Sequence, residues 1–138
     1  MPSNSFKPPT TLNHQPSLPP CTIYHLANCT TCQAILKSIP NVDRFTLREI
    51  KSEPITAKEL DAMKALAGSY EVLFSRVAMK YRSLGLNTKT LSEKDYRKHI
   101  LEEYTFLKRP VMVVDGRIHI GNAPKVRAAM VEEGRRAR

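Results

Sequence analysis

The pattern of hydrophobic and polar positions opens with a strand, a helix and a second strand. A β-rich apolar run covers residues 21–26, and the stretch after it places apolar residues at helical spacing until Pro40. Val42 to Ile50 then alternates well enough to predict a second strand. The first part of the chain therefore predicts a βαβ unit.

The middle of the chain predicts helices alone. Thr56 and Glu59 form a capping box in front of an apolar helical pattern. Residues 69–86 also have helical periodicity, interrupted near Ser75, and Ser92 begins another helix. These helices would separate the βαβ unit from whatever completes the sheet.

The last part of the chain predicts a β-hairpin and a closing helix. Val111–Val114 reads as a buried strand, and Arg117–Ile120 as its partner across an Asp-Gly turn. Asn122 is expected to cap a final helix that has Pro124 in its first turn and ends at about Glu133. The element order predicts an α/β fold of the thioredoxin-like type, with a helical insertion between a βαβ and a ββα half.

Composition sets the expected domain boundaries. Residues 1–20 hold six of the ten prolines, so they cannot bury enough apolar area to offset the entropy of ordering and are expected to be a disordered extension. Residues 21–133 are expected to be one domain, and residues 134–138 a basic tail. We find no apolar run long enough to span a membrane and no export signal, which predicts a cytoplasmic protein.

The charge of the chain is strongly and unevenly positive. Lys and Arg total 22 against 13 Asp and Glu, for a net charge of +9. From Arg76 onward there are 15 basic and 7 acidic residues. Such an excess indicates an anionic partner, and it leaves nucleic acid, a phosphate-like substrate and an acidic protein surface open.

The strongest chemical signal is a C-x-x-C motif between a predicted strand and a helix start. The helix amides and dipole favour the thiolate of Cys29, and Cys32 lies one turn later, close enough to form a disulfide with it. Two buried structural cysteines are one alternative. A zinc site that adds Cys21 and His25 is another, but Cys21 would lie more than a strand length from the loop, so no metal is expected.

Arg109-Pro110 precedes the predicted buried strand and is the second candidate feature. A cis bond there would bring the preceding residue toward the Cys29 loop, where a guanidinium presents a fork of donors to an oxyanion. His25 and Asn28 lie just before Cys29 and are supporting candidates. His25 could be a hydrogen-bond partner or general base, or purely structural.

Four segments in this order resemble the glutaredoxin-dependent arsenate reductase (ArsC) family, which includes the Spx-type transcriptional regulators. The segments extend from residue 22 to about 130 and are Thr22-Ile-Tyr-His-Leu-Ala-Asn-Cys-Thr-Thr-Cys32, Ile50-Lys-Ser-Glu-Pro-Ile55, Leu73-Phe-Ser-Arg76 with Tyr81-Arg-Ser-Leu-Gly-Leu86, and Leu107-Lys-Arg-Pro-Val111 with Ile120-Gly-Asn122.

This resemblance implies a thiol-dependent oxidoreductase. Cys29 matches the nucleophile that attacks arsenate, and Arg76 and Arg109 match basic residues that hold the oxyanion, with Thr30 and Thr31 beside them at the helix start. It further implies glutathione as cosubstrate, no bound cofactor, and glutaredoxin as the partner that regenerates the thiol.

The sequence departs from the reductases in three places. Cys32 stands where reductases have Ser, Gln33 stands where Arg often follows, and no arginine occurs near Gly121-Asn122. Spx-type members do have the C-x-x-C. The alternative is therefore a redox-switched regulator that binds the RNA polymerase α subunit rather than nucleic acid directly.

Overall fold

The computed structural model describes residue 18 and residues 20–137. The predicted extension 1–20 lies almost entirely outside these residues. In chain order the helices and strands are β2 (Cys21–His25), α1 (Thr30–Ser38), β3 (Thr46–Glu49), α2 (Ala57–Ala67), α3 (Met79–Ser83), α4 (Glu93–Glu102), β4 (Val111–Val114), β5 (Arg117–Ile120) and α5 (Pro124–Arg136). Short 3₁₀ turns occur at Val42–Arg44, Glu71–Leu73, Leu86–Thr88 and Tyr104–Phe106.

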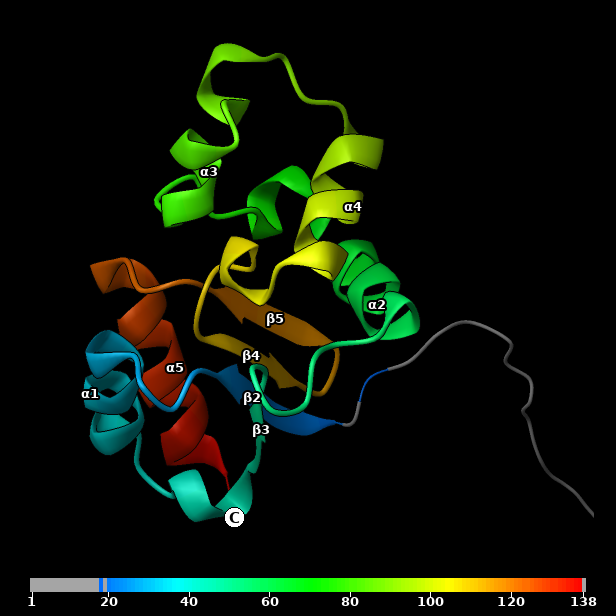
Figure 1. The fold of residues 1–138 in the computed structure, drawn as a ribbon. Coiled ribbons are helices and arrows are strands. Elements are labelled where there is room, and N and C mark those ends of the chain that lie inside the picture. Colours follow the sequence, from blue (N-terminus) through cyan, green and yellow to red (C-terminus); the bar gives the residue numbers. More distant parts are fainter. Residues whose placement is uncertain (1–17, 19, 138) are drawn as a thin grey trace, which may run out of the picture.

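The strands form one mixed sheet in the order β3-β2-β4-β5. β2 pairs parallel with β3 and antiparallel with β4, and β4 pairs antiparallel with β5. Helices α1 and α5 lie on one side of the sheet, whereas α2, α3 and α4 form the insertion on the other side (Figure 1). The predicted order of two halves around a helical insertion is confirmed.

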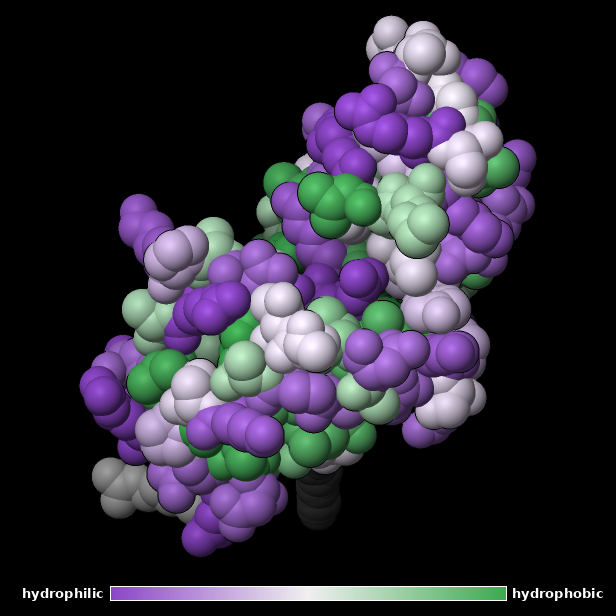
Figure 2. Space-filling model, turned by 60° about the vertical axis from the view of Figure 1, so that its left-hand side comes forward, coloured by the Kyte–Doolittle hydropathy of each residue, from purple (hydrophilic) through white to green (hydrophobic). Residues whose placement is uncertain are grey.

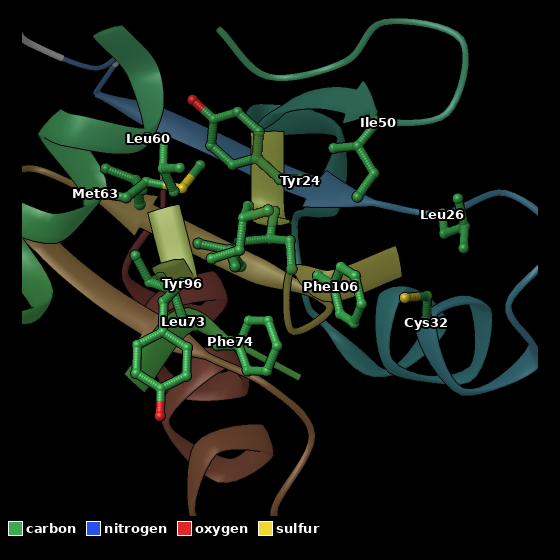
Figure 3. Packing of buried hydrophobic residues seen from close by; sticks show 14 of the residues in the cluster. Tyr24, Leu26, Cys32, Ile50, Leu60, Met63, Leu73, Phe74, Tyr96 and Phe106 are labelled. Atoms are coloured by element: carbon green, nitrogen blue, oxygen red, sulfur yellow. The ribbon is translucent and has the colours of Figure 1, made fainter. Parts of the chain in front are cut away.

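The alternation of side chains along the strands divides the core in two. Tyr24, Val111 and Val113 belong to a cluster under the insertion, whereas Ile23 and Met112 belong to a cluster under α1 and α5. Figure 3 shows the first cluster. A strand that is buried on both faces, such as β4, needs the nearly unbroken apolar run that the sequence has there.

The predicted strand from Val42 to Ile50 is half as long as expected. Val42–Arg44 forms a 3₁₀ turn, which begins after Asn41 in the left-handed region at φ 56°. Phe45 then enters the core below α1, and pairing with β2 starts only at Thr46. The alternating apolar pattern of residues 42–50 therefore arises from the buried side chain of Phe45 followed by a short strand.

The predicted helix over residues 69–86 is also wrong over most of its length. The chain extends at Phe74, which bridges to Leu107, and the amide of Ser75 donates to the carbonyl of Phe106 at 2.7 Å. Only Met79–Ser83 is α-helical. Tertiary pairing with residues 106–108 therefore overrides the local helical periodicity.

The closing helix differs from the prediction at both ends. Ala123, not Asn122, is its N-cap, and the carbonyl of Asn122 instead accepts from Nε of Arg127 at 3.0 Å. The helix ends at Arg136, so three residues assigned to the predicted tail continue it. Among the residues described, no helix is both long and apolar enough to cross a membrane.

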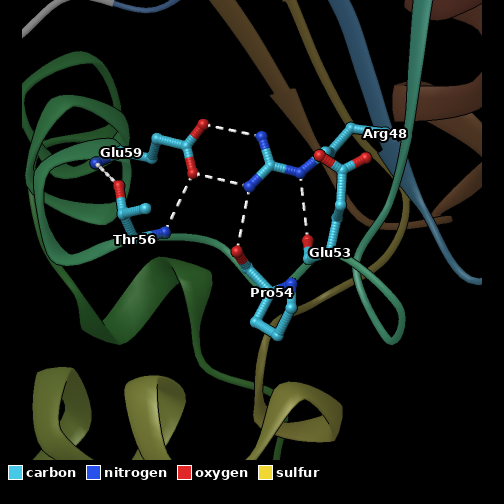
Figure 4. Close-up of polar contacts among 5 residues, drawn as sticks. All are labelled: Arg48, Glu53, Pro54, Thr56 and Glu59. Atoms are coloured by element: carbon cyan, nitrogen blue, oxygen red, sulfur yellow. Dashed lines mark hydrogen bonds and ion pairs between the residues drawn. The ribbon is translucent and has the colours of Figure 1, made fainter.

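A polar network fastens the insertion to the sheet. The predicted capping box is confirmed, because Thr56 and Glu59 exchange hydrogen bonds at the start of α2. The guanidinium of Arg48 on β3 binds both carboxylate oxygens of Glu59, at 2.7 and 2.9 Å, and donates to the carbonyls of Glu53 and Pro54 (Figure 4). This fork holds α2 against β3.

Candidate active site

The C-x-x-C motif lies where the buried strand β2 gives way to α1. After β2 the amide of Cys29 donates to the carbonyl of Leu26 at 3.1 Å, which turns the chain into the helix. Cys29 is the N-cap of α1, and its Sγ accepts from the amide of Cys32 at 3.4 Å. A cysteine thus takes the role that Ser or Asp usually has at a helix start.

A carboxylate that the sequence analysis missed anchors this turn. One oxygen of Glu49, at the end of β3, accepts from the amide of Ala27 at 2.9 Å, and the other accepts from the amide of Ser52 at 2.8 Å. These bonds, with that from Ala27 the strongest, lower the pKa of Glu49 to about 2. The loop before Cys29 is therefore tied to the parallel neighbour of β2.

The two thiols have opposite acidities. Partial burial raises the pKa of Cys29, but the hydrogen bonds from Cys32 and the positive charge of Arg109 outweigh it, so the net pKa lies below its usual value. Cys32 has no exposed surface, and its burial raises its pKa to about 11. Cys29 is therefore the more acidic thiol of the pair, and Cys32 is the less acidic one, buried in the core.

Cys29 opens into a cleft of about 580 Å³, here called the Cys29 cleft. The residues that line it come from α1, the insertion, the β4 loop and the start of α5; they are Cys29, Thr31, Phe74, Ser75, Arg76, Val77, Lys108, Arg109, Ile120, Gly121, Asn122 and Ala123. Three of them are cations and none is an acid. Figure 2 shows a hollow between the two parts of the molecule with hydrophilic residues in it. The cleft is suited to an anion.

Arg109 lies beside Cys29, as predicted. One of its terminal nitrogens donates to the carbonyls of Thr105 and Leu107, at 3.0 and 3.2 Å, and its charge lowers the pKa of Cys29. Its Nε is buried without a partner among the described residues. The peptide bond from Arg109 to Pro110 is cis, as expected.

Arg76 lies at the rim of the same cleft, but neighbouring side chains already bind its guanidinium. Its guanidinium donates to Glu71 at 3.0 Å and to the hydroxyl of Tyr96 at 2.8 Å, and it packs over the rings of Tyr96 and Phe74. The structure therefore brings Arg76 and Arg109 into one cleft with Cys29, although 33 residues separate the two arginines.

The other candidate residues divide between the cleft and its surroundings. Thr31 lines the cleft, whereas Thr30 and Asn28 are exposed and lie outside its lining. His25 pairs with Glu49 in the register of β2 and β3, and burial lowers the pKa of the His25 ring.

Lys108 is the cleft residue that sequence reasoning missed. Its side chain passes over Gly121, where an added Cβ would meet Cδ of Lys108 at 4.0 Å. Lys108 thereby brings a positive charge to the part of the chain where the expected third arginine is missing. Its position next to Arg109 was the available signal, because both belong to the loop that enters β4.

A metal site does not form around the pair in the described part of the chain, where no three His, Cys, Asp or Glu side chains group as metal ligands. Cys21 instead lines a separate pocket with Arg44 and Arg117. The zinc alternative therefore has no structural support.

A mixed α/β fold that presents a capping cysteine to a cationic cleft defines a thioredoxin-like thiol protein. A sequence model of the ArsC family matches residues 24–130, and the chain belongs to this family.

Curated relatives fall in the regulator branch. The chain is 29% identical over 103 residues to global transcriptional regulator Spx 1 of Bacillus cereus, covering 72% of this chain and 78% of that one. It is 26% identical over 103 residues to Spx of Enterococcus faecalis, with 72% and 77% covered.

Solved structures with the same fold carry ArsC names. An ArsC-family-related protein from Bacteroides fragilis superposes with a TM-score of 0.67 at 23% identity, covering 80% of this chain and 96% of that one. An arsenate-reductase-related protein from Brucella melitensis gives 0.62 at 25% identity, with 83% and 96% covered. Sequence and fold thus point to two branches of one family.

Proposed function

We propose that the protein is a thiol-dependent oxidoreductase in which Cys29 attacks an oxyanion or a disulfide and a second thiol, from glutathione or Cys32, resolves the product. The observation that carries the proposal is that Cys29, the more acidic thiol of the pair, lines a cleft that has three cations and no acid, while Cys32 is buried one turn away. Attack by a thiolate on an anion requires that charge be neutralised, and the Cys29 cleft supplies the neutralising groups.

With arsenate, the thiolate of Cys29 forms a sulfur–arsenic bond and one arsenate oxygen leaves as water. A second thiol, from glutathione or Cys32, then attacks the sulfur of Cys29. The electron pair of the sulfur–arsenic bond passes to arsenic, which leaves as arsenite, while the two sulfurs form a disulfide. Glutathione is therefore the proposed cosubstrate, and glutaredoxin the proposed reductant of the disulfide.

A cysteine series tests the proposal. Cys29→Ser is expected to abolish arsenate reduction with glutathione and glutaredoxin, whereas Cys32→Ser should keep it if glutathione resolves the adduct. Cys21→Ser is the matched control, because Cys21 lies in a different pocket, and it should react like the wild type. Full activity in Cys29→Ser, or none in the wild type with either arsenate or a disulfide, would remove the proposal.

The second candidate function is a redox-switched regulator. Two observations favour it: the buried Cys32 one turn from Cys29, where reductases carry Ser, and the Spx relatives. Oxidation would join the two sulfurs and alter the surface around α1. Binding of the RNA polymerase α subunit to the oxidised but not the reduced protein, with no arsenate turnover, would select this function.

Both functions require that Cys29 start as a free thiolate. All three cysteines are unpaired in the structure. A reducing compartment maintains this state, so we place the protein in the cytoplasm.

A further inference from the structure

The rim of the Cys29 cleft carries an unusual concentration of exposed apolar side chains. Among the described residues, six large hydrophobic side chains are exposed, and four of them lie on residues 72–84 of the insertion; these four are Val72, Val77, Met79 and Leu84. We call residues 72–84 the rim segment. Val77 is 91% exposed and Met79 is 90% exposed, and Val77 also lines the cleft.

These side chains contribute little to folding. A valine or methionine side chain left in water forgoes the stabilisation that its burial would provide. Other large apolar residues nearby do reach the core, as Phe74 does within the rim segment and Leu86 does just after it. Val77 and Met79 are therefore placed to be buried by something outside this chain.

The rim segment is also cationic. Arg76, Lys80 and Arg82 alternate with the apolar positions over a stretch that has no acidic residue between 72 and 84. Figure 2, which looks onto the side of the molecule that carries α1 and α3, shows hydrophobic residues beside the hydrophilic hollow. Arg76 and Lys80 pair with Glu71 and Glu103, which leaves an excess of positive charge beside the apolar side chains. Such a surface fits an acidic protein surface with an apolar centre.

We propose that the rim segment is the docking surface for a small, acidic, thiol-bearing protein that exchanges electrons with Cys29. This inference rests on the proposed function and assigns the surface that its protein reductant uses. A macromolecule that brings a sulfur to Cys29 must cover the mouth of the cleft, and Val77 is part of that mouth.

The exchange is a two-electron transfer between a dithiol and a disulfide. A thiolate of the partner attacks Sγ of Cys29 in the Cys29–Cys32 disulfide, and Cys32 leaves as a thiolate that takes up a proton. The second partner thiol attacks the partner's own sulfur in the mixed disulfide and releases the thiolate of Cys29. The partner leaves as a disulfide.

Reduction of the oxidised full-length chain by two reductants tests the docking surface. One reductant is a dithiol glutaredoxin of acidic surface, and the other is dithiothreitol, which is too small to need the rim. Met79→Ser is expected to lower kcat/KM with glutaredoxin about tenfold, through KM, and to leave the rate with dithiothreitol unchanged. Added salt should lower the wild-type kcat/KM with glutaredoxin only.

Leu66→Ser is the matched control, because Leu66 is exposed on α2 and does not line the cleft. It should behave as wild type with both reductants. The docking proposal is overturned if Met79→Ser matches wild type with glutaredoxin, if it loses rate equally with dithiothreitol, or if sedimentation shows that Met79→Ser splits a dimer of this chain. The docking proposal is also overturned if dithiothreitol reduces the wild type but glutaredoxin does not. If neither reductant acts, the proposed function itself fails.

Discussion

Two groups of basic side chains among the described residues differ in one respect: the first surrounds a buried carboxylate, and the second does not. On the α5 side of the sheet, Arg117, His119 and Arg136 all contact the carboxylate of Glu133, which is 3% exposed. We call these four residues the Glu133 cluster. In the Cys29 cleft, by contrast, three cations face a hollow that no carboxylate lines.

This difference distinguishes charged side chains that stabilise the fold from charged side chains that remain available to a ligand. A buried carboxylate with several partners stabilises the fold because removing it leaves positive charges against each other. Cations that face an open cleft gain nothing comparable until an anion arrives. The same residue types thus serve the fold in the Glu133 cluster and, in the proposed function, chemistry in the Cys29 cleft, and substitutions should separate the two roles.

The largest expected effect on folding belongs to the Glu133 cluster. Glu133→Ala removes the acceptor of two hydrogen bonds from Arg117, at 2.7 and 2.9 Å, and should lower the free energy of unfolding by about 3 kcal/mol. Urea denaturation measures this. Glu132→Ala, whose pair with Arg135 is exposed, should change it by less than about 0.5 kcal/mol. Equal losses of unfolding free energy in Glu133→Ala and Glu132→Ala would contradict the distinction between the two groups of charges.

The stabilisation by Glu133 should depend on pH in a defined direction. The hydrogen bonds from Arg117, against the opposing effect of burial, lower the pKa of Glu133 from 4.5 to about 2. A carboxylate with a lowered pKa in the folded state stabilises fully above pH 4.5 and loses that contribution as the pH falls toward 2. The difference in stability between wild type and Glu133→Gln should therefore shrink over this window.

The largest expected effect on reactivity belongs to Arg109. Arg109→Ala should raise the pKa of Cys29, because the charge of Arg109 helps to lower it, and should reduce kcat/KM for the oxyanion roughly hundredfold. The pH dependence of alkylation by iodoacetamide reports the pKa. Arg109→Lys should recover part of the pKa shift but less of the turnover, since a lysine cannot present the fork. An unchanged alkylation profile in Arg109→Ala would count against this assignment.

How far the sequence predicts this molecule depends on which contacts are local. The C-x-x-C loop, the capping box of α2 and the β4–β5 hairpin are set by neighbouring residues, and all three were predicted correctly. The strand expected from Val42 is confirmed only over Thr46–Glu49, and the helix expected from residue 69 only over Met79–Ser83. In both segments a distant partner decides the conformation: β2 pairs with Thr46, and Leu107 bridges to Phe74.

The residues of the candidate site divide in the same way, into those that a local pattern identifies and those that it does not. Cys29 and Arg109 could be singled out because each lies in a recognisable local pattern. Lys108 had only its position next to Arg109 as a signal, and the anchoring carboxylate of Glu49 had none, because its role arises only when β3 brings it to the loop of Cys29. Long-range packing of this kind leaves no periodic signal in a single sequence.

A smaller effect is expected at Lys108. Lys108→Ala removes one of three positive charges from the cleft and should raise KM for arsenate about tenfold, with a change in unfolding free energy below about 0.5 kcal/mol. Lys108→Arg keeps the charge and should restore most of the affinity. Steady-state kinetics at two salt concentrations checks both variants, since the loss should diminish as salt screens the site. An unaltered KM in Lys108→Ala would show that the ammonium does not reach the anion.

The smallest effect is expected at the ion pair of Glu71 and Arg76, in which a cation of the Cys29 cleft already contacts an acid. Both side chains are about half exposed, so Glu71→Gln should change the unfolding free energy by no more than about 0.5 kcal/mol. The hydroxyl of Tyr96 still holds Arg76 at 2.8 Å, so the guanidinium stays at the rim with one fewer competing acid. KM for arsenate should therefore fall slightly, by at most about twofold.

Tyr96→Phe, which keeps the ring under Arg76 but loses that hydrogen bond, should change KM in the opposite direction. A rise of KM in Glu71→Gln would mean that Glu71 orients Arg76 rather than competes for it.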